Sequence, residues 1–281
     1  MPRAIPRRVL LLERIHADAD PILEAAGLEV VRHDAAMPAA ELAEAAAEAD
    51  ADLVGIRSKS RVDGSVLDRC PELHAIGCFC IGTNQVDAGA AGRLGVPVFN
   101  SPFSNTRSVA ELVIAEIIGL HRSLLDRSMA MHGGRWEKTA SGANEIRGRT
   151  LGIVGYGHIG TQVSIMAEAM GMRVLYHDVV EKLPLGNARP VPMAELPAES
   201  DVVTLHVPAT ERTRGMIDAD AIRAMKPGAI LINNARGSVV DLDALADALR
   251  REHLRGAAID VFPEEPASNH AAFRTPLAGL P

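Results

Sequence analysis

Residues Leu151–Gly160 form the stretch LGIVGYGHIG, a short apolar run that breaks into the pattern G-x-G-x-x-G and then continues as a helical sequence. In this pattern Gly155 permits a tight turn, Gly157 lets the backbone approach a pyrophosphate, and Gly160 lets the next helix pack closely on the strand. The free N–H groups at the start of that helix would face the phosphates. The stretch therefore predicts a β-α-β unit that binds a dinucleotide.

The sequence that follows the glycines strengthens this prediction, because the glycine pattern alone also arises by chance in other loops. A helix-length segment runs from 161 to 171 and ends at Gly171, a residue suited to a helix end. A second strand, Arg173–Asp178, follows at once and ends in an acidic residue. We expect the Asp178 carboxylate to bind the adenosine ribose and to repel a 2′-phosphate, which favours NAD over NADP. The alternative is a structural β-α-β unit without a nucleotide.

Length and composition are those of an ordinary globular chain. The 281 residues predict two domains, and a hydrophobic content of 47% is ample for their cores. The formal net charge of -7 comes without a basic stripe, so we expect no nucleic-acid partner. We also expect no membrane partner, because no apolar run has membrane-spanning length and the N-terminus lacks the features of a signal peptide. Three cysteines fit a reducing cytoplasm, and the spacing of Cys78 and Cys80 does not suggest a metal site.

Strand-like and helical segments alternate along the chain. Apolar runs at 9–12, 28–32 and 53–56 are separated by helical segments at 21–26 and 39–49. Such alternation is typical of parallel β-α-β units, so the predicted fold class is α/β with doubly wound, Rossmann-like parallel sheets.

The segment Asn100–Asn105 interrupts this alternation and is the candidate domain hinge. A long amphipathic helix is predicted after it, from about Arg107 to Met131. Its apolar face could pack on a core or on a second subunit. That face comprises Val109, Leu112, Val113, Glu116, Ile117 and Leu120.

Later strands deliver polar residues to the edge of the second sheet. A buried strand at 201–208 is followed by another that begins at Gly228 and leads to Arg236. The carboxyl ends of strands line the ligand crevice in doubly wound sheets, and an arginine among apolar neighbours there needs an anion such as a carboxylate. The alternative is a surface arginine just beyond the strand. A further strand leads into PEEP at 263–266, where two prolines fix the loop that presents Glu265.

Three runs together resemble the D-isomer-specific 2-hydroxyacid dehydrogenases: GYGHIG at 155–160, NNARGSVVD at 233–241 and AAIDVFPEEP at 257–266. Supporting runs are IGCFCIGTNQVD at 76–87 and PFSNTRSVAE at 102–111. The resemblance extends over nearly all of the chain. It implies a substrate-binding domain at 1–103 that lacks a returning C-terminal segment, and an NAD-binding Rossmann domain at 104–281 that lacks its last strand. It also implies a homodimer or tetramer formed through the helix near 107–131.

The resemblance further implies roles for individual residues in the second domain. Arg236 would clamp the carboxylate and C2 oxygen of the substrate, and Glu265 would partner a catalytic histidine. Pyrophosphate contacts would come from the three motif glycines with His158 and Ile159, and the ribose contact from Asp178. The nicotinamide end would be held by Asn234, Ala235, Arg236 and Asp260.

In the first domain the resemblance implies a site for the phosphate and carboxylate of the substrate. Its residues would be Arg57, Ser58, Ile81, Gly82 and Asn84. A basic residue directly after a buried strand suits a phosphate, although Lys59 or Arg61 could serve as well as Arg57.

The chemistry of the family is hydride transfer between C2 of a 2-hydroxy acid and a nicotinamide. The motifs match best the branch that oxidises 3-phospho-D-glycerate to 3-phosphohydroxypyruvate with NAD, the first step of L-serine biosynthesis. Another D-2-hydroxy acid is an alternative substrate, because specificity depends on contacts in the first domain.

The catalytic histidine of the family lies in a motif that we expect to follow Pro281, so we expect the native chain to be longer. A second hypothesis takes the chain as an NAD-binding module or remnant with little catalysis. Three histidines of this chain could be considered in place of the catalytic histidine, and we favour none of them. His206 suits a structural or cofactor contact at a strand end, His253 a solvated helix position, and His270 a surface loop.

Overall fold

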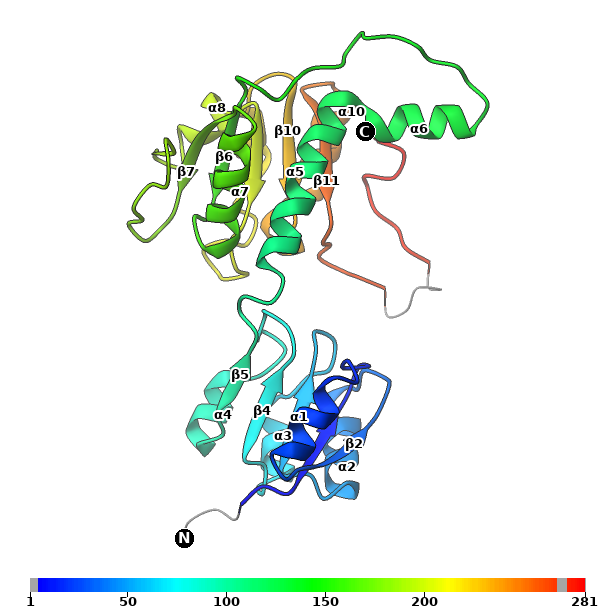
Figure 1. Cartoon of the computed structure of the whole chain (residues 1–281), viewed down its shortest axis with the longest axis vertical. Helices are drawn as coiled ribbons and strands as arrows, with labels where there is room; N and C mark the ends of the chain where they lie inside the picture. The colour runs from blue at the N-terminus through cyan, green and yellow to red at the C-terminus, as the bar shows by residue number, and fades with distance from the viewer. Residues whose placement is uncertain (1–4, 267–271, 281) are drawn as a thin grey trace. The chain divides into compact units, whose positions relative to one another are not determined.

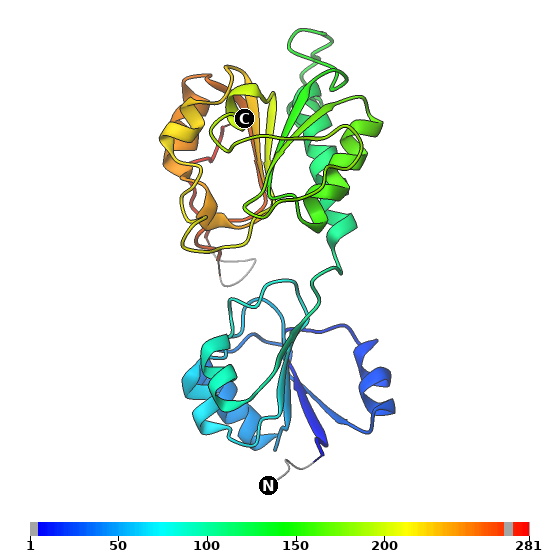
Figure 2. The same ribbon diagram turned by 90° about the vertical axis from the view of Figure 1, so that its left-hand side faces the viewer.

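The computed structural model describes residues 5–266 and 272–280, which leaves His270 outside the described residues. The chain forms two compact units, unit 1 up to Asn105 and unit 2 from Thr106 (Figure 1). Each unit is a parallel sheet with helices on both of its faces (Figure 2). The predicted α/β class with doubly wound parallel sheets is therefore confirmed.

The sheet of unit 1 has the strand order β2-β1-β3-β4-β5 within the described part of the chain. Its strands are β1 (Arg8–Leu11), β2 (Glu29–Arg32), β3 (Leu53–Ile56), β4 (Ala75–Cys78) and β5 (Val98–Asn100). Its helices are α1 (Ala19–Ala25), α2 (Ala39–Glu48), α3 (Gly64–Arg69) and α4 (Ala88–Leu94). In such an order the chain reverses its direction of progress between β1 and β3, and ligands bind where the carboxyl ends of those strands separate.

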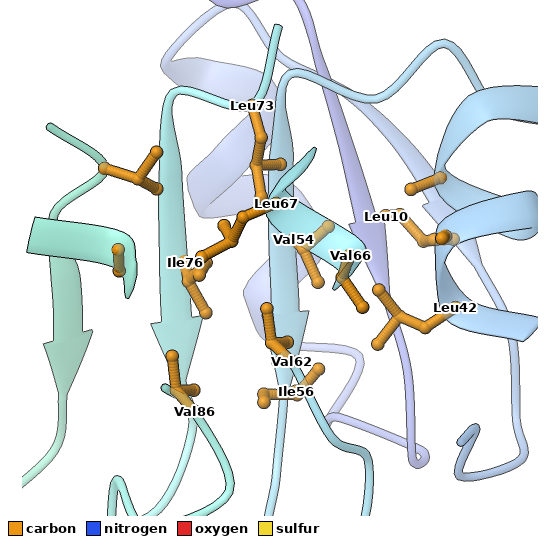
Figure 3. Close-up of a cluster of buried hydrophobic side chains, with 14 of the residues drawn as sticks. Leu10, Leu42, Val54, Ile56, Val62, Val66, Leu67, Leu73, Ile76 and Val86 are labelled. Atoms are coloured by element: carbon orange, nitrogen blue, oxygen red, sulfur yellow. The ribbon is translucent and has the colours of Figure 1, made fainter. Parts of the chain in front are cut away.

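The apolar run of β1 is continuous because both faces of the sheet are covered. Leu10 belongs to a core beneath α2, α3 and α4 (Figure 3), whereas Val9 and Leu11 belong to a second core beneath α1. Successive side chains of a strand point to opposite faces, so a strand buried on both sides needs apolar residues at every position.

The sheet of unit 2 has the order β11-β10-β9-β6-β7-β8 within the described residues. Its strands are β6 (Thr150–Val154), β7 (Arg173–His177), β8 (Arg189–Pro190), β9 (Val202–Leu205), β10 (Ala229–Asn233) and β11 (Leu254–Ile259). This is the strand order of dinucleotide-binding folds, in which the ligand crevice opens between the strands that correspond to β6 and β9.

Helices cover both faces of this second sheet. They are α5 (Thr106–Arg122), α6 (Leu124–His132), α7 (His158–Ala169), α8 (Leu196–Glu199), α9 (Ala219–Arg223) and α10 (Leu242–Arg250), with a 3₁₀ turn at Gly237–Val239. Along β10, Ile230 and Ile232 join the core formed with α5 and α7, whereas Leu231 joins the core formed with α9 and α10. Burial on both faces again explains a continuous apolar strand.

The prediction of a single long helix from about Arg107 to Met131 is wrong. Ser123 has a left-handed backbone (φ 47°), which ends α5 at Arg122 and starts α6 at Leu124. Arg255, from β11, donates to the carbonyl of His121 (3.2 Å) and to Oγ of Ser123 (3.5 Å). The break is therefore held by a contact from a distant part of the sequence. The expected apolar face is only partly buried, because Leu112 is exposed.

No helix within residues 5–266 and 272–280 is both long enough and apolar enough to cross a membrane.

Candidate functional site

The glycine-rich turn of unit 2 joins β6 to α7 at the centre of the sheet. Gly155 has a φ of +95°, and a Cβ built there would lie 2.5 Å from the carbonyl oxygen of His206. A Cβ on Gly160 would lie 2.2 Å from the carbonyl oxygen of Gly155. Both positions therefore exclude any side chain, one through backbone conformation and the other through the close packing of α7 on the turn.

Gly157 differs from these two glycines because no described residue beyond its own turn fills the space beside it. It is the N-cap of α7 with an extended φ, and a Cβ built there would have no atom within 4 Å. No side chain caps α7, whereas Asp241 caps α10 by accepting hydrogen bonds from the N–H groups of Asp243 and Ala244. An open, uncapped helix start suits an anion such as a pyrophosphate. The two residues that begin α7, His158 and Ile159, are exposed and half-buried, respectively.

Asp178 lies directly after β7, against the glycine-rich turn. Its Oδ2 accepts a hydrogen bond from the Tyr156 N–H (2.8 Å), and its Oδ1 accepts one from the Val180 N–H (2.9 Å). The carboxylate is half-buried, and each of its oxygens can accept a further hydrogen bond. The structure thus brings Asp178 beside the turn that would hold a pyrophosphate.

On the other side of β6, the ends of β9 and β10 carry buried polar atoms that have no hydrogen-bond partner among the described residues. These atoms are Nδ1 of His206 and Oδ1 of Asn234. Unpaired polar atoms are costly to bury, so their presence at one sheet edge fits a ligand that offers hydrogen-bonding groups, as a nicotinamide carboxamide does. The edge thus has both the open helix start and the polar atoms that a bound NAD would use.

His206 is held neutral at this edge. Burial lowers its pKa to about 4, and its Nε2 lies 3.1 Å from Oγ1 of Thr204. A general acid–base works best with a pKa near the operating pH, so His206 is poorly suited to proton transfer at neutral pH. This agrees with the strand-end role expected for it.

His253 is not the solvated helix residue expected from the sequence. It follows the end of α10, is half-buried, and its Nε2 lies 3.1 Å from the carbonyl oxygen of Ile222 in α9. The ring therefore ties two helices together, away from the ends of β9 and β10.

Arg236 is half-buried and follows β10 in a turn fixed by Asn233. The Asn233 amide donates to the carbonyl of Arg236 (3.0 Å) and accepts from the Ala235 N–H (3.1 Å). One guanidinium nitrogen, Nη1, donates to the carbonyl of Ala235 (2.7 Å), which leaves the rest of the planar group available for other acceptors.

Gly237 allows this turn to approach the segment that contains Glu265 closely. A Cβ on Gly237 would lie 2.0 Å from the carbonyl carbon of Phe262, so only glycine permits the close approach of the two backbones. Glu265 is exposed, and its Oε1 accepts a long hydrogen bond from the Phe262 N–H (3.4 Å). Asp260 is also exposed, and its N–H donates to the carbonyl of Asn233 (3.1 Å).

Glu116 is a further carboxylate at this edge. From the sequence it was expected only as a member of the apolar face of a helix. Its Oε2 accepts a hydrogen bond from Nδ2 of Asn234 (3.0 Å). Burial and the nearby Asp260 charge raise the pKa of Glu116 to about 7, although the Asn234 hydrogen bond opposes the shift. The signal available in the sequence was a single acidic residue among apolar positions at helical spacing.

In unit 1 the residues expected to bind substrate follow β3 and β4. Arg57 and Ser58 are exposed at the carboxyl end of β3, Ile81 and Gly82 are half-buried after β4, and Asn84 is exposed. All five therefore lie on loops at the edge where such a sheet binds ligands.

The buried Glu13, after β1, fixes the β3 loop. Its carboxylate accepts hydrogen bonds from the N–H groups of Arg57 (3.1 Å), Lys59 (3.0 Å) and Ser60 (2.8 Å). These bonds lower the pKa of Glu13 although burial acts to raise it. Glu13 and Arg14 both have left-handed backbones (φ 58° and 51°), a strain that the bonds can sustain. No local pattern in the sequence indicates this role of Glu13, since its partners lie more than 40 residues away.

A second buried side chain, Gln85, joins the two loops. Its Nε2 donates to the carbonyls of Arg57 (2.7 Å) and Gly82 (3.1 Å). Beside this joint, Arg57, Arg14, His16 and Phe79 line part of a surface pocket of about 520 Å³. Asp18 lines the same pocket, so its two arginines leave a net positive charge that favours an anionic ligand. No group of His, Cys, Asp and Glu side chains suited to a metal ion occurs among the residues that the structure describes.

Comparison with known proteins agrees with these features. Residues 114–279 match the family model for the D-isomer specific 2-hydroxyacid dehydrogenase, NAD binding domain. A D-3-phosphoglycerate dehydrogenase of Escherichia coli is 51% identical over 272 residues, which are 96% of this chain and 66% of the relative. One from Dictyostelium discoideum is 51% identical and covers 98% of the chain and 67% of the relative.

Solved structures show the same fold. The TT0316 protein from Thermus thermophilus aligns with a TM-score of 0.85 at 36% identity, covering 96% of this chain and 85% of the other. D-lactate dehydrogenase from Aquifex aeolicus, complexed with NAD and lactic acid, aligns with a TM-score of 0.80 at 31% identity, covering 91% and 77%. The chain therefore spans just under two thirds of the length of the E. coli relative, while covering most of each solved structure.

Proposed function

The chain belongs to the D-isomer-specific 2-hydroxyacid dehydrogenase family, and on that basis we propose that the protein oxidises 3-phospho-D-glycerate to 3-phosphohydroxypyruvate with NAD. This is the first step of L-serine biosynthesis. The observation that carries the proposal is the 51% identity, over 96% of the chain, to a relative named D-3-phosphoglycerate dehydrogenase.

In this proposal the carboxyl edge of unit 2 binds the cofactor. Bound NAD supplies a nicotinamide ring that accepts the hydride. Asp178 binds the adenosine ribose on the β7 side, and the uncapped start of α7 holds the pyrophosphate. The pyrophosphate residues are Gly155, Gly157, His158, Ile159 and Gly160, and those at the nicotinamide end are Asn234, Ala235, Arg236 and Asp260.

Arg236 binds the carboxylate and C2 oxygen of the substrate. Its half-buried guanidinium is planar and permanently charged, so it both orients the carboxylate and polarises the C2 oxygen. Glu265 orients the histidine that exchanges a proton with the C2 oxygen and stabilises its cationic form. The resemblance assigns that histidine to a motif after position 281, and His206, with its lowered pKa, does not replace it.

Unit 1 supplies the remaining substrate contacts. Arg57 and Ser58 bind the phosphate group and, with Ile81, Gly82 and Asn84, complete the site for the substrate. The support is the position of their loops at the carboxyl edge of the sheet and the anchoring of those loops by Glu13 and Gln85.

We further propose that the protein works in the cytoplasm as a homodimer or tetramer. The free cysteines Cys70, Cys78 and Cys80 suit a reducing compartment. The helices α5 and α6 offer an apolar surface to a second copy of the chain. Its exposed members include Leu112, Leu124, Leu125, Met129 and Met131.

The substitution Arg236→Ala tests the assignment of the substrate clamp. In the protein as its gene encodes it, kcat/KM for 3-phospho-D-glycerate should fall by about 10²–10³-fold, because one charged donor to the reacting oxygen is lost. The dissociation constant for NADH should stay within about twofold, since the guanidinium of Arg236, although it lies at the nicotinamide end of the cofactor site, binds the substrate. Arg236→Lys, which keeps the charge and loses the planar fork, should recover only part of the rate. Unchanged kcat/KM in Arg236→Ala would remove Arg236 from the site.

A further inference from the structure

Glu116 stands out as a charged group on the buried side of a helix. It lies on α5 between Val113 and Ile117, which are fully buried in the core shared with α7. Glu116 itself is half-buried, and its carboxylate accepts a hydrogen bond from Nδ2 of Asn234, at the carboxyl end of β10. A carboxylate in such surroundings is expensive to ionise, so an apolar residue would be the cheaper occupant.

The strand order indicates which half of a bound NAD would lie near the carboxylate of Glu116. The adenosine side is marked by Asp178 after β7, and the pyrophosphate side by the start of α7 after β6. In the order β11-β10-β9-β6-β7-β8, the other half of a dinucleotide must therefore extend from β6 over the ends of β9 and β10. That edge carries Asn234, to which Glu116 is bonded.

We propose that Glu116 sets the relative affinity of unit 2 for the two oxidation states of NAD, its carboxylate favouring the oxidised form. The oxidised nicotinamide ring carries a positive charge and the reduced ring carries none. A fixed negative charge near the ring therefore stabilises NAD⁺ and leaves NADH unaffected. The inference rests on the cofactor placement in the proposed function.

Within the described part of the chain, the groups that shift the pKa of Glu116 are a neutral amide and a like charge. Asn234 from β10 is neutral, and Asp260, which follows β11, adds a second negative charge. Helix α7 contributes Val163 and Ala167 to this core, and its ionisable residues are His158 and Glu168. Arg236, two residues after Asn234, keeps its positive charge while it donates to the carbonyl of Ala235, and it is not among the groups that shift the pKa of Glu116. With a pKa of about 7, Glu116 carries its charge mainly above neutral pH.

The substitution Glu116→Gln isolates the charge, because glutamine keeps an oxygen that can accept from Asn234. Dissociation constants for NAD⁺ and NADH should be measured by calorimetry at about pH 8.5, where Glu116 is ionised, and at about pH 6, where it is protonated. At the higher pH the variant should lower the NADH-to-NAD⁺ ratio of dissociation constants by about three- to tenfold. At the lower pH the ratio should match that of the unsubstituted protein.

Asp247→Asn is the matched control. It removes the same charge from α10, where Asp247 is exposed and paired with Arg251, and it should leave the ratio unchanged at both pH values. A second readout is the ¹³C titration of the Glu116 carboxyl. Since linkage is reciprocal, saturating NAD⁺ should lower its pKa and saturating NADH should not.

The outcomes separate this inference from the proposed function. A ratio within twofold of the unsubstituted value at about pH 8.5 overturns the inference, as does equal weakening of both forms, which would indicate a purely structural role. In either case, the proposed function would still hold if the unsubstituted protein binds NAD⁺ and turns over 3-phospho-D-glycerate. Failure of the unsubstituted protein to bind either form would overturn both.

Discussion

At the carboxyl edge of unit 1, buried side chains bind the loops, whereas at the same edge of unit 2 polar atoms are left unpaired. Glu13 and Gln85 satisfy the backbone of the β3 and β4 loops in unit 1. In unit 2, α7 starts without a side-chain cap, and buried atoms of His206 and Asn234 have no partner in the part of the chain that the structure describes. Both sheets are parallel and doubly wound, so the difference comes from the residues that follow the strands.

This difference indicates two ways of binding an anion with one type of fold. Unit 2 relies on backbone N–H groups and on glycines that clear space, which suits a cofactor of fixed shape. Unit 1 relies on side chains such as Arg57, carried on loops whose backbone is fixed from below. Side chains are replaced more readily than a backbone turn, so we expect substrate choice to depend on unit 1.

Substitution of the motif glycines should have the largest effect on binding, because unit 2 binds its anion through the backbone and unit 1 through side chains. Gly157→Ala should weaken NAD⁺ binding by at least about tenfold with little change in stability, because its Cβ meets no protein atom but enters the space left for the pyrophosphate. Gly160→Ala should weaken binding and also lower the free energy of unfolding by about 1–3 kcal/mol, because its Cβ overlaps the carbonyl of Gly155. Calorimetric binding and denaturant unfolding measure the two effects. Undiminished binding in Gly157→Ala would show that the helix start does not hold the cofactor.

A smaller effect is expected from the anchor of unit 1. Glu13→Gln should raise KM for 3-phospho-D-glycerate several-fold and lower the free energy of unfolding by about 2 kcal/mol, because an amide cannot accept all three N–H bonds. The dissociation constant for NADH should not change. Steady-state kinetics and urea unfolding provide both numbers.

Glu44→Gln is the control for Glu13, since Glu44 is an exposed carboxylate of α2 that pairs with the exposed Arg69 at 3.4 Å. It should alter stability by no more than about 0.5 kcal/mol. An unchanged KM in a folded Glu13→Gln protein would mean that the β3 loop does not bind substrate.

The smallest expected effect concerns the choice between NAD and NADP. Asp178→Asn keeps an oxygen that can accept from the Tyr156 N–H but removes the charge that repels a 2′-phosphate. The ratio of kcat/KM for NAD to that for NADP should therefore fall by about fivefold. If this ratio did not fall, the assignment of Asp178 to the ribose would be wrong.

The fold was largely predictable because its signals are local. The strand expected at 53–56 is β3, and the glycine pattern at 155–160 begins α7 where expected. Continuous apolar runs and glycine spacing act over a few residues and can be recognised without knowing the rest of the chain.

Features that depend on distant contacts were missed. The break at Ser123 is held by Arg255, and the roles of Glu13 and Gln85 depend on loops that are remote in sequence. Glu116 was counted within an apolar helix face because its partner, Asn234, is 118 residues away. Tertiary contacts of this kind override local preference and leave no periodic signal.

The central claim is that unit 2 binds NAD and that the loops of unit 1 bind the phosphate group of a 2-hydroxy acid. It is tested most directly by the initial rate of NADH formation from NAD⁺ by the protein as its gene encodes it. The rate should be measured with 3-phospho-D-glycerate, D-glycerate and D-lactate. The account predicts that kcat/KM for 3-phospho-D-glycerate exceeds the others by at least about 10²-fold, because only that substrate offers a phosphate to Arg57. Equal or higher values for the substrates without phosphate, or no NADH from any of them, would contradict it.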